Sequence, residues 1–305
     1  MSHLVTITGA TGHIGGQIAE RLLEAGHRVR AVGRSKEKLN SLVEKGAESH
    51  VGDLADTEFL TGAFQGADAA FAMIPPNPAA EDIRADQRKF AASIIEAIKN
   101  AGVKRVVALS SAGGGLPSGT GPIAGLHEFE ELLKTLPDTS VVVLRPTFFM
   151  ENFLYTIPMI KSSGINGSLI GGDVSMPLVA TRDMAAVAAE YLAVPTFEGY
   201  TVHELYGPRD YTYREATSIL GAAIGKPDLP YVEFPKEDYR KGLLDAGFSA
   251  SVADSYLEME TAMDDGRLQA TINRDEKSTT PTTLEEFARD TFAPACKGSV
   301  AEARA

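Results

Sequence analysis

Tryptophan is absent from this sequence, and cysteine occurs only once, at Cys296. A single cysteine excludes an internal disulfide and a cysteine-based metal site, and it favours a reducing, cytoplasmic location. Basic residues are also scarce: 29 Lys and Arg against 41 Asp and Glu give a formal net charge of −12. This charge argues against nucleic acid or an anionic membrane as a partner. The six histidines show no paired ligand spacing, so we predict no metal.

Long apolar runs are missing as well. No stretch approaches the length that a membrane-spanning helix needs, and Met1-Ser2-His3 leads directly into a predicted strand rather than into a signal peptide. We therefore expect no membrane association. The hydrophobic share of 44% and the charged share of 23% are typical of a globular chain that buries a large core. An enzyme acting on a small molecule fits these limits.

The most informative pattern that is present is a strand, a glycine-rich turn and a helix at the start of the chain. Residues 4–8 are apolar or β-branched and predict a buried strand, and Ile14, Ile18 and Leu22 recur at helical spacing. Glycine is needed between them because the backbone must turn tightly and approach a pyrophosphate, to which the helix N-terminus presents free N–H groups. We predict a dinucleotide site rather than a purely structural turn. Its predicted contacts are Gly9, Thr11, Gly12, His13, Ile14 and Gly15.

Strand and helix patterns alternate through the first half of the chain. The predicted strands after the first cover residues 29–32, 49–51, 69–74, 106–109 and 141–144. The predicted helices between them begin at Ser35 and Asp56 and cover 80–101 and 126–136. This alternation implies parallel pairing with right-handed crossovers, and fully apolar strands suit a sheet that is covered on both faces. The predicted fold class is α/β, a Rossmann-type doubly wound parallel sheet over residues 1–146.

The rhythm changes after Arg145-Pro146. Residues 147–160 are aromatic and methionine-rich, and a glycine-rich segment follows. We expect a small C-terminal α/β substrate lobe over 147–296, from which segments at about 175–207 return to the Rossmann sheet. Thr283 and Glu286 fit a capping box for a last helix, and residues 297–305 are expected to form a frayed tail.

The end of the second strand bears on the choice of cofactor. An NAD-specific site needs Asp or Glu there to hold the ribose hydroxyls, whereas this chain has Gly33-Arg34-Ser35. Arg34 places a planar cation where a 2′-phosphate would lie, and Ser35 and Lys38 can add donors. The alternative is that Arg34 is merely a solvated residue at a strand end. The missing acid and the present base both favour NADP(H).

Residues at the ends of other parallel strands should line the same crevice. We expect Asp53 and Leu54 to flank the adenine, although Asp53 suits a turn equally well. Met73-Ile74-Pro75-Pro76 is a stiff segment, which either contacts the ribose and nicotinamide or is an ordinary exit loop. Ser110 and Ser111 either face the substrate or satisfy the backbone of their loop.

Several motifs follow one another in a familiar order. They are Thr8-Gly9-Ala10-Thr11-Gly12-His13-Ile14-Gly15, Gly52-Asp53-Leu54, Ala101-Gly102-Val103-Lys104, Ser110-Ser111, His127-x-x-x-Glu131, Leu144-Arg145-Pro146-Thr147-Phe148-Phe149-Met150-Glu151-Asn152 and Pro281-Thr282-Thr283-Leu284-Glu285-Glu286-Phe287. With them the chain resembles an NmrA-like member of the atypical short-chain dehydrogenase/reductases. The resemblance implies either an NADPH-dependent quinone or dye reductase or a protein that binds NADPH to sense redox state.

The resemblance also identifies a departure in the catalytic machinery. Conventional members of the superfamily carry Tyr-x-x-x-Lys on the helix after strand five, and the pair aligned with it here is His127-x-x-x-Glu131. Because the Tyr–Lys relay is absent, we do not expect alcohol–ketone interconversion. His127 is the candidate general acid, and Glu131, one turn away, is placed to orient it or raise its pKa. The alternative is that His127 only packs against the cofactor or caps the helix.

A group of apolar residues lies just past strand six, where related folds bind substrate. These residues suit either a pocket for a flat aromatic acceptor or the core. They are Phe148, Phe149, Met150, Asn152 and Phe153. The interpretation that follows is an NADPH-dependent oxidoreductase that passes hydride to a small electron-poor acceptor such as a quinone or dye. The competing hypothesis is a non-catalytic NADPH-binding redox sensor that acts through a protein partner, and a weaker one is a relic that only binds the cofactor.

Overall fold

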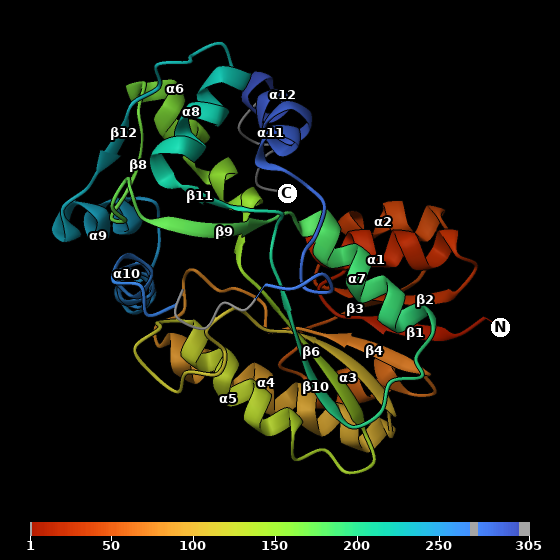
Figure 1. Ribbon diagram of the computed structural model, residues 1–305. Helices are drawn as coiled ribbons and strands as arrows, with labels where there is room; N and C mark the ends of the chain where they lie inside the picture. The colour runs from red at the N-terminus through yellow and green to blue at the C-terminus, as the bar shows by residue number, and fades with distance from the viewer. Residues whose placement is uncertain (1, 269–273, 299–305) are drawn as a thin grey trace.

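A seven-stranded parallel sheet is the centre of the structure, which is a computed structural model that describes residues 2–268 and 274–298 (Figure 1). Every neighbouring pair of strands runs in the same direction. In spatial order the strands are β10 (Tyr200–Leu205), β6 (Ser140–Pro146), β5 (Arg105–Leu109), β4 (Ala69–Ala72), β1 (Leu4–Ile7), β2 (Arg28–Gly33) and β3 (Glu48–Val51). The predicted α/β Rossmann-type fold is confirmed.

Helices cover both faces of this sheet, as Figure 1 shows. One apolar core joins one face to α1 (His13–Glu24), α2 (Lys36–Glu44) and α7 (Thr181–Ala193). A second core joins the other face to α3 (Thr57–Phe64), α4 (Ile83–Ala101) and α5 (Ile123–Leu133). The strand order reverses direction between β1 and β4, and ligands of open α/β sheets bind at such a point.

Capping residues explain where these helices begin. Asp56 accepts a hydrogen bond from the Phe59 backbone N–H at 3.0 Å, which confirms it as the N-cap of α3. The helix expected from residue 80 begins instead at Ile83, because Asp82 caps it through the backbone N–H groups of Arg84 and Ala85. Gly102 ends that helix in the left-handed conformation, at φ 68°.

The remaining elements form a second unit with its own apolar core. Its strands are β7 (Phe148–Phe149), β9 (Ser175–Val179) and β11 (Asp210–Thr212) in one sheet and β8 (Asn166–Ser168) and β12 (Tyr231–Glu233) in another. Its helices are η1 (Met150–Thr156), α6 (Ile157–Ser163), α8 (Tyr213–Ala223), α9 (Lys236–Asp245), α10 (Ala250–Asp264), α11 (Leu284–Phe287), η3 (Ala288–Phe292) and α12 (Ala293–Lys297). The predicted capping box of Thr283 and Glu286 is present at the start of α11.

The segment expected to return to the central sheet does so only in part. Strand β10 pairs with β6, and α7 belongs to the core that covers β1 and β2. Strand β9 instead joins the second unit, because it pairs with β7 on one side and with β11 on the other. The expected tail lies outside the described residues from residue 299 onward. Of the described helices, none is long and apolar enough to cross a membrane.

The junction of strand, turn and helix at the start of the chain is packed backbone against backbone. Gly9 has a positive φ of 65°, which favours glycine. A Cβ atom placed on Gly15 would lie 2.4 Å from the Gly9 carbonyl oxygen and 2.7 Å from the carbonyl carbon. Glycine at position 15 therefore allows α1 to approach the turn after β1.

We expect Gly15→Ala to lower the free energy of unfolding by about 1–3 kcal/mol, because backbone atoms cannot move aside as a flexible side chain would. Gly62→Ala is the matched control, since a Cβ there meets nothing within 4 Å on helix α3. Urea denaturation of both variants measures the difference. Equal stability of the two variants would show that the close approach of Gly15 to Gly9 carries no cost.

Candidate functional site

The start of helix α1 is left open by the protein. Gly12 is its N-cap residue and offers no capping side chain, and the first turn contains no acidic residue. Free N–H groups and a positive helix end attract an anion. A Cβ on Gly12 would contact only the Gly9 carbonyl oxygen, at 3.4 Å, so space exists above this residue that does not exist above Gly15. The turn therefore fits the diphosphate of a dinucleotide.

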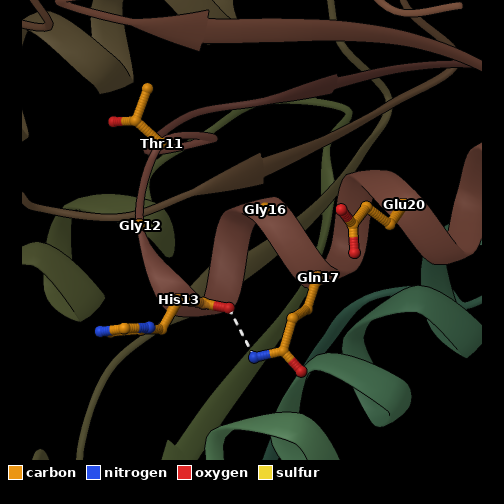
Figure 2. A pocket seen from close by; sticks show the side chains of 6 residues that line it. All are labelled: Thr11, Gly12, His13, Gly16, Gln17 and Glu20. Carbon is orange, nitrogen blue, oxygen red and sulfur yellow. Dashed lines mark hydrogen bonds between the residues drawn. The ribbon is translucent and has the colours of Figure 1, made fainter. Parts of the chain in front are cut away.

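A hollow of about 230 Å³ lies beside this helix start (Figure 2). It is lined by Thr11, Gly12, His13, Gly16, Gln17 and Glu20. The Gln17 side chain donates a hydrogen bond from Nε2 to the His13 carbonyl at 2.7 Å, which the dashed line in Figure 2 marks. The predicted residues Thr11, Gly12 and His13 thus line one hollow, while Ile14 packs partly against the core.

Arg34 lies exposed at the carboxyl end of β2 and forms no hydrogen bond or ion pair with any described residue. Its guanidinium group is therefore available to an incoming phosphate. Ser35 is less free, because its hydroxyl caps α2 by accepting from the Lys38 backbone N–H at 3.2 Å and donates to Glu37 at 2.8 Å. Glu37, which the sequence reasoning overlooked, has a lowered pKa because of its own backbone N–H and the Ser35 hydroxyl.

After β3 and β4, some predicted contact residues expose their side chains, and others bury them and leave only their backbone accessible. Asp53 is exposed and accepts from the Ala55 backbone N–H at 2.9 Å, which is the turn role considered as its alternative. The side chains of Leu54 and Ile74 are 6% and 8% exposed and belong to the core, so only their backbone can meet a ligand. Met73 lies over the glycine turn, since its sulfur would be 2.9 Å from a Cβ on Gly9.

Pro75 is half-buried in the loop that follows β4, and Ser111 is half-buried in the loop that follows β5. Ser110 is different, because it is buried and its hydroxyl donates to Glu130 at 2.5 Å. The hydroxyl of Ser110 is therefore engaged inside the protein, a role that neither of the two alternatives for this residue had included.

The predicted pair on α5 does not form. His127 is half-buried, and its Nδ1 lies 2.9 Å from the Gly114 carbonyl oxygen. Glu131 is exposed and pairs with Lys134 at 2.6 Å, and that partner is the main cause of its lowered pKa. The expectation that Glu131 orients His127 is wrong, because each side chain has a different hydrogen-bond partner.

On α5, the acidic side chain that faces the interior is that of Glu130, which the sequence reasoning missed. It is 1% exposed and accepts hydrogen bonds from Arg145 at 2.6 and 2.9 Å, from Ser110 at 2.5 Å and from Tyr200 at 3.3 Å. Burial and the Glu130 carboxylate together raise the pKa of Tyr200, and the hydrogen bonds to Glu130 raise the pKa of Arg145 as well. A basic residue directly after the apolar run 141–144 was the available signal, because a buried cation needs a partner.

The five residues predicted to line a substrate pocket divide into two groups. Met150 and Phe153 are 0% and 3% exposed and are part of the second unit's core, the alternative considered for them. Phe148, Phe149 and Asn152 are half-buried. Phe148 packs against Phe153 with ring centroids 5.6 Å apart, so the core supports one side of its ring. The pocket remains a prediction for these three half-buried residues.

Comparison with known proteins agrees with this architecture. The sequence model of the NmrA-like family matches residues 1–288. The NAD(P)H azoreductase of Xenophilus azovorans is 29% identical over 259 residues, which covers 84% of this chain and 86% of that protein. Quinone oxidoreductase 2 of Escherichia coli is 28% identical over 271 residues, which covers 87% of this chain and 90% of that protein.

A solved structure shares the whole fold. It is an NADPH-dependent quinone oxidoreductase of Escherichia coli in complex with NADPH, which superimposes with a TM-score of 0.79 at 24% identity. The match covers 94% of this chain and 99% of that one. The described residues of our chain contain no group of three His, Cys, Asp or Glu that could hold a metal ion.

We expect Gly12→Val to abolish dinucleotide binding, because its side chain would occupy the space that Gly12 leaves open to the diphosphate. The melting temperature should change little, since the nearest protein atom lies at contact distance. Calorimetric titration with NADPH and a thermal melt measure the two effects. Unchanged NADPH affinity would refute the assignment of the glycine turn.

Arg34→Ala should weaken NADPH more than NADH by about 1.5–3 kcal/mol, the range for a hydrogen bond to a charged group. Arg34→Lys should restore part of this difference, because an ammonium group keeps the charge but not the planar fork. Titration of both cofactors against the three proteins measures the effect. Equal losses for NADPH and NADH would mean that Arg34 does not select the 2′-phosphate.

Proposed function

The chain belongs to the NmrA-like family, and from that membership and the geometry of its site we propose that it is an NADPH-dependent oxidoreductase. Its substrate is a small electron-poor acceptor, a quinone or a dye. The chain is similar to an azoreductase and to a quinone oxidoreductase, and these two names state that the relatives reduce azo compounds and quinones. We also place the enzyme in the cytoplasm, because its single thiol, Cys296, forms no disulfide.

The observation that carries the proposal is an open helix N-terminus beside Arg34, which has no ion-pair partner among the described residues, at neighbouring strand ends. The N–H groups at the start of α1 fit a diphosphate, and Arg34 fits a 2′-phosphate. No carboxylate stands in the segment Gly33–Ser35 to select the unphosphorylated ribose. These features together favour NADPH over NADH.

The bound cofactor would supply the hydride, so the protein's own residues have to orient the acceptor and provide a proton. Reduction of a quinone to its hydroquinone takes up one hydride and one proton. His127 is the titratable group that we assign to the proton, because it lies on α5 close to the loop after β5. An electron-poor acceptor needs little acid assistance, which is consistent with the absence of the Tyr–Lys relay.

The half-buried rings of Phe148 and Phe149 support the choice of a flat acceptor. They form strand β7 directly after β6, close to the carboxyl edge of the central sheet. Aromatic side chains in such places commonly line ligand pockets and offer stacking surfaces. A planar quinone or aromatic dye matches these surfaces better than a saturated substrate does.

We predict that the protein oxidises NADPH in the presence of a simple quinone and does not reduce NADP⁺ with secondary alcohols. If His127 delivers the proton in the slow step, His127→Phe should lower kcat by about 10²–10⁴-fold while NADPH affinity is kept. Absorbance of NADPH under steady-state conditions measures both rates. Tight NADPH binding without oxidation by quinones, dyes or aldehydes would contradict the reductase and favour a redox sensor.

A further inference from the structure

We propose that the buried carboxylate of Glu130 is the positioning residue for His127. The inference rests on the proposed function, because it concerns the proton that His127 delivers. In the proposal, Glu130 holds the loop of residues 110–114, and the Gly114 carbonyl in that loop fixes the tautomer of His127. This indirect connection takes the place of the direct His127–Glu131 pair that the sequence suggested.

Glu130 joins three elements around one carboxylate. It projects from α5, it accepts from the Ser110 hydroxyl at the end of β5, and it binds the Arg145 guanidinium near the end of β6 through two nitrogens. A planar guanidinium held at two points has a defined orientation. The charges of Glu130 and Arg145 offset each other in a buried place, so neither is free to bind a substrate.

The loop after β5 lies directly on this ion pair. A Cβ on Gly114 would lie 2.3 Å from Glu130 Oε1 and 2.7 Å from Ser110 Oγ, and one on Gly115 would lie 3.4 Å from Arg145 Nη1. At Gly114 the loop backbone can approach this closely because the residue lacks a side chain, whereas a Cβ on Gly115 would make only an ordinary contact. The Gly114 backbone therefore lies directly against the Glu130 carboxylate and the Ser110 hydroxyl, and in the proposal this close packing sets the position of the Gly114 carbonyl.

The Gly114 carbonyl has a chemical consequence for His127. A carbonyl oxygen accepts hydrogen bonds and cannot donate them, so the Nδ1 atom that lies 2.9 Å away must carry the hydrogen. In the neutral ring Nε2 is then the unprotonated nitrogen. The hydrogen bond of one nitrogen thus decides which atom of the ring exchanges the proton.

The first test reads the tautomer directly, without any turnover. Protein labelled with ¹⁵N-histidine should show His127 with its hydrogen on Nδ1, and assignment uses the loss of that signal in His127→Phe. Gly114→Ala should weaken this preference, because the added methyl group pushes the loop away from Glu130. Gly242→Ala is the matched control, since a Cβ there meets nothing within 4 Å. A wild-type His127 with its hydrogen on Nε2, or an unchanged tautomer in Gly114→Ala, would overturn the proposal.

The second test removes the carboxylate itself. Glu130→Gln alone removes the carboxylate that binds Arg145 at two points and leaves only Glu204, 4.0 Å from Arg145 Nη1, as an ion-pair partner among the described residues, so we expect it to destabilise the fold and combine it with Arg145→Met. Glu128→Gln is the matched control. Glu128 also lies on α5 and accepts from arginines, but these are Arg84 and Arg88. In the double variant, His127 should lose its preference for hydrogen on Nδ1, and in Glu128→Gln it should keep that preference. The same His127 tautomer in the double variant and in Glu128→Gln would contradict the role of Glu130.

Turnover then separates this proposal from the proposed function. Gly114→Ala should lower kcat by about 10- to 100-fold, the cost of misplacing a reacting group by roughly 1 Å, with KM for NADPH unchanged. An unchanged kcat in Gly114→Ala, measured where His127→Phe loses activity, would overturn the positioning role. A wild-type protein that oxidises no NADPH contradicts the reductase alone, because the tautomer measurements still decide what Glu130 does.

Discussion

Parallel pairing of the seven central strands is the constraint on which the site depends. Because the strands all run in one direction, their carboxyl ends meet at one edge, and the order reverses there between β1 and β4. The glycine turn, Arg34, Met73, Ser110 and the residues after β6 are far apart in the sequence, yet each follows one of these strand ends. The fold therefore brings these residues to one edge of the sheet, where we propose that the dinucleotide binds.

The positive charges at this edge of the sheet have two different surroundings. Within the part of the chain that the structure describes, neither the start of α1 nor the exposed side chain of Arg34 has an anionic partner. Arg145, at the end of β6, is bound on two nitrogens by the buried Glu130. We therefore expect the phosphate groups on the β1–β2 side of the sheet. On the β5–β6 side the charges of Glu130 and Arg145 offset each other, and we propose that this pair supports the loop next to His127.

The fold followed from the sequence because its signals are local. Glycines after apolar strands, caps such as Asp56 and the alternation of strands and helices depend on neighbours in the chain, and the order of these elements was predicted correctly. Two helix boundaries were wrong, because the helix expected over 80–101 begins at Ile83 and the one expected over 126–136 covers Ile123–Leu133. Within the segment of about 175–207 that was expected to return to the central sheet, β9 lies in the second unit instead, because its pairing with β7 and β11 depends on residues distant in the sequence. Helical spacing predicted a pair of His127 and Glu131, but Glu131 pairs with Lys134 instead. The contact between Glu130 and Arg145 depends on the tertiary fold, which brings α5 and β6 together.

The central claim is that this chain brings NADPH to an acceptor at the carboxyl edge of its sheet. A crystal structure of the protein with bound NADPH tests it most directly. The account predicts the diphosphate on the glycine turn, the 2′-phosphate within hydrogen-bond distance of Arg34, and an open space next to C4 of the nicotinamide that a flat ring can enter. A nicotinamide C4 covered by protein atoms, with no room for an acceptor, would contradict the claim.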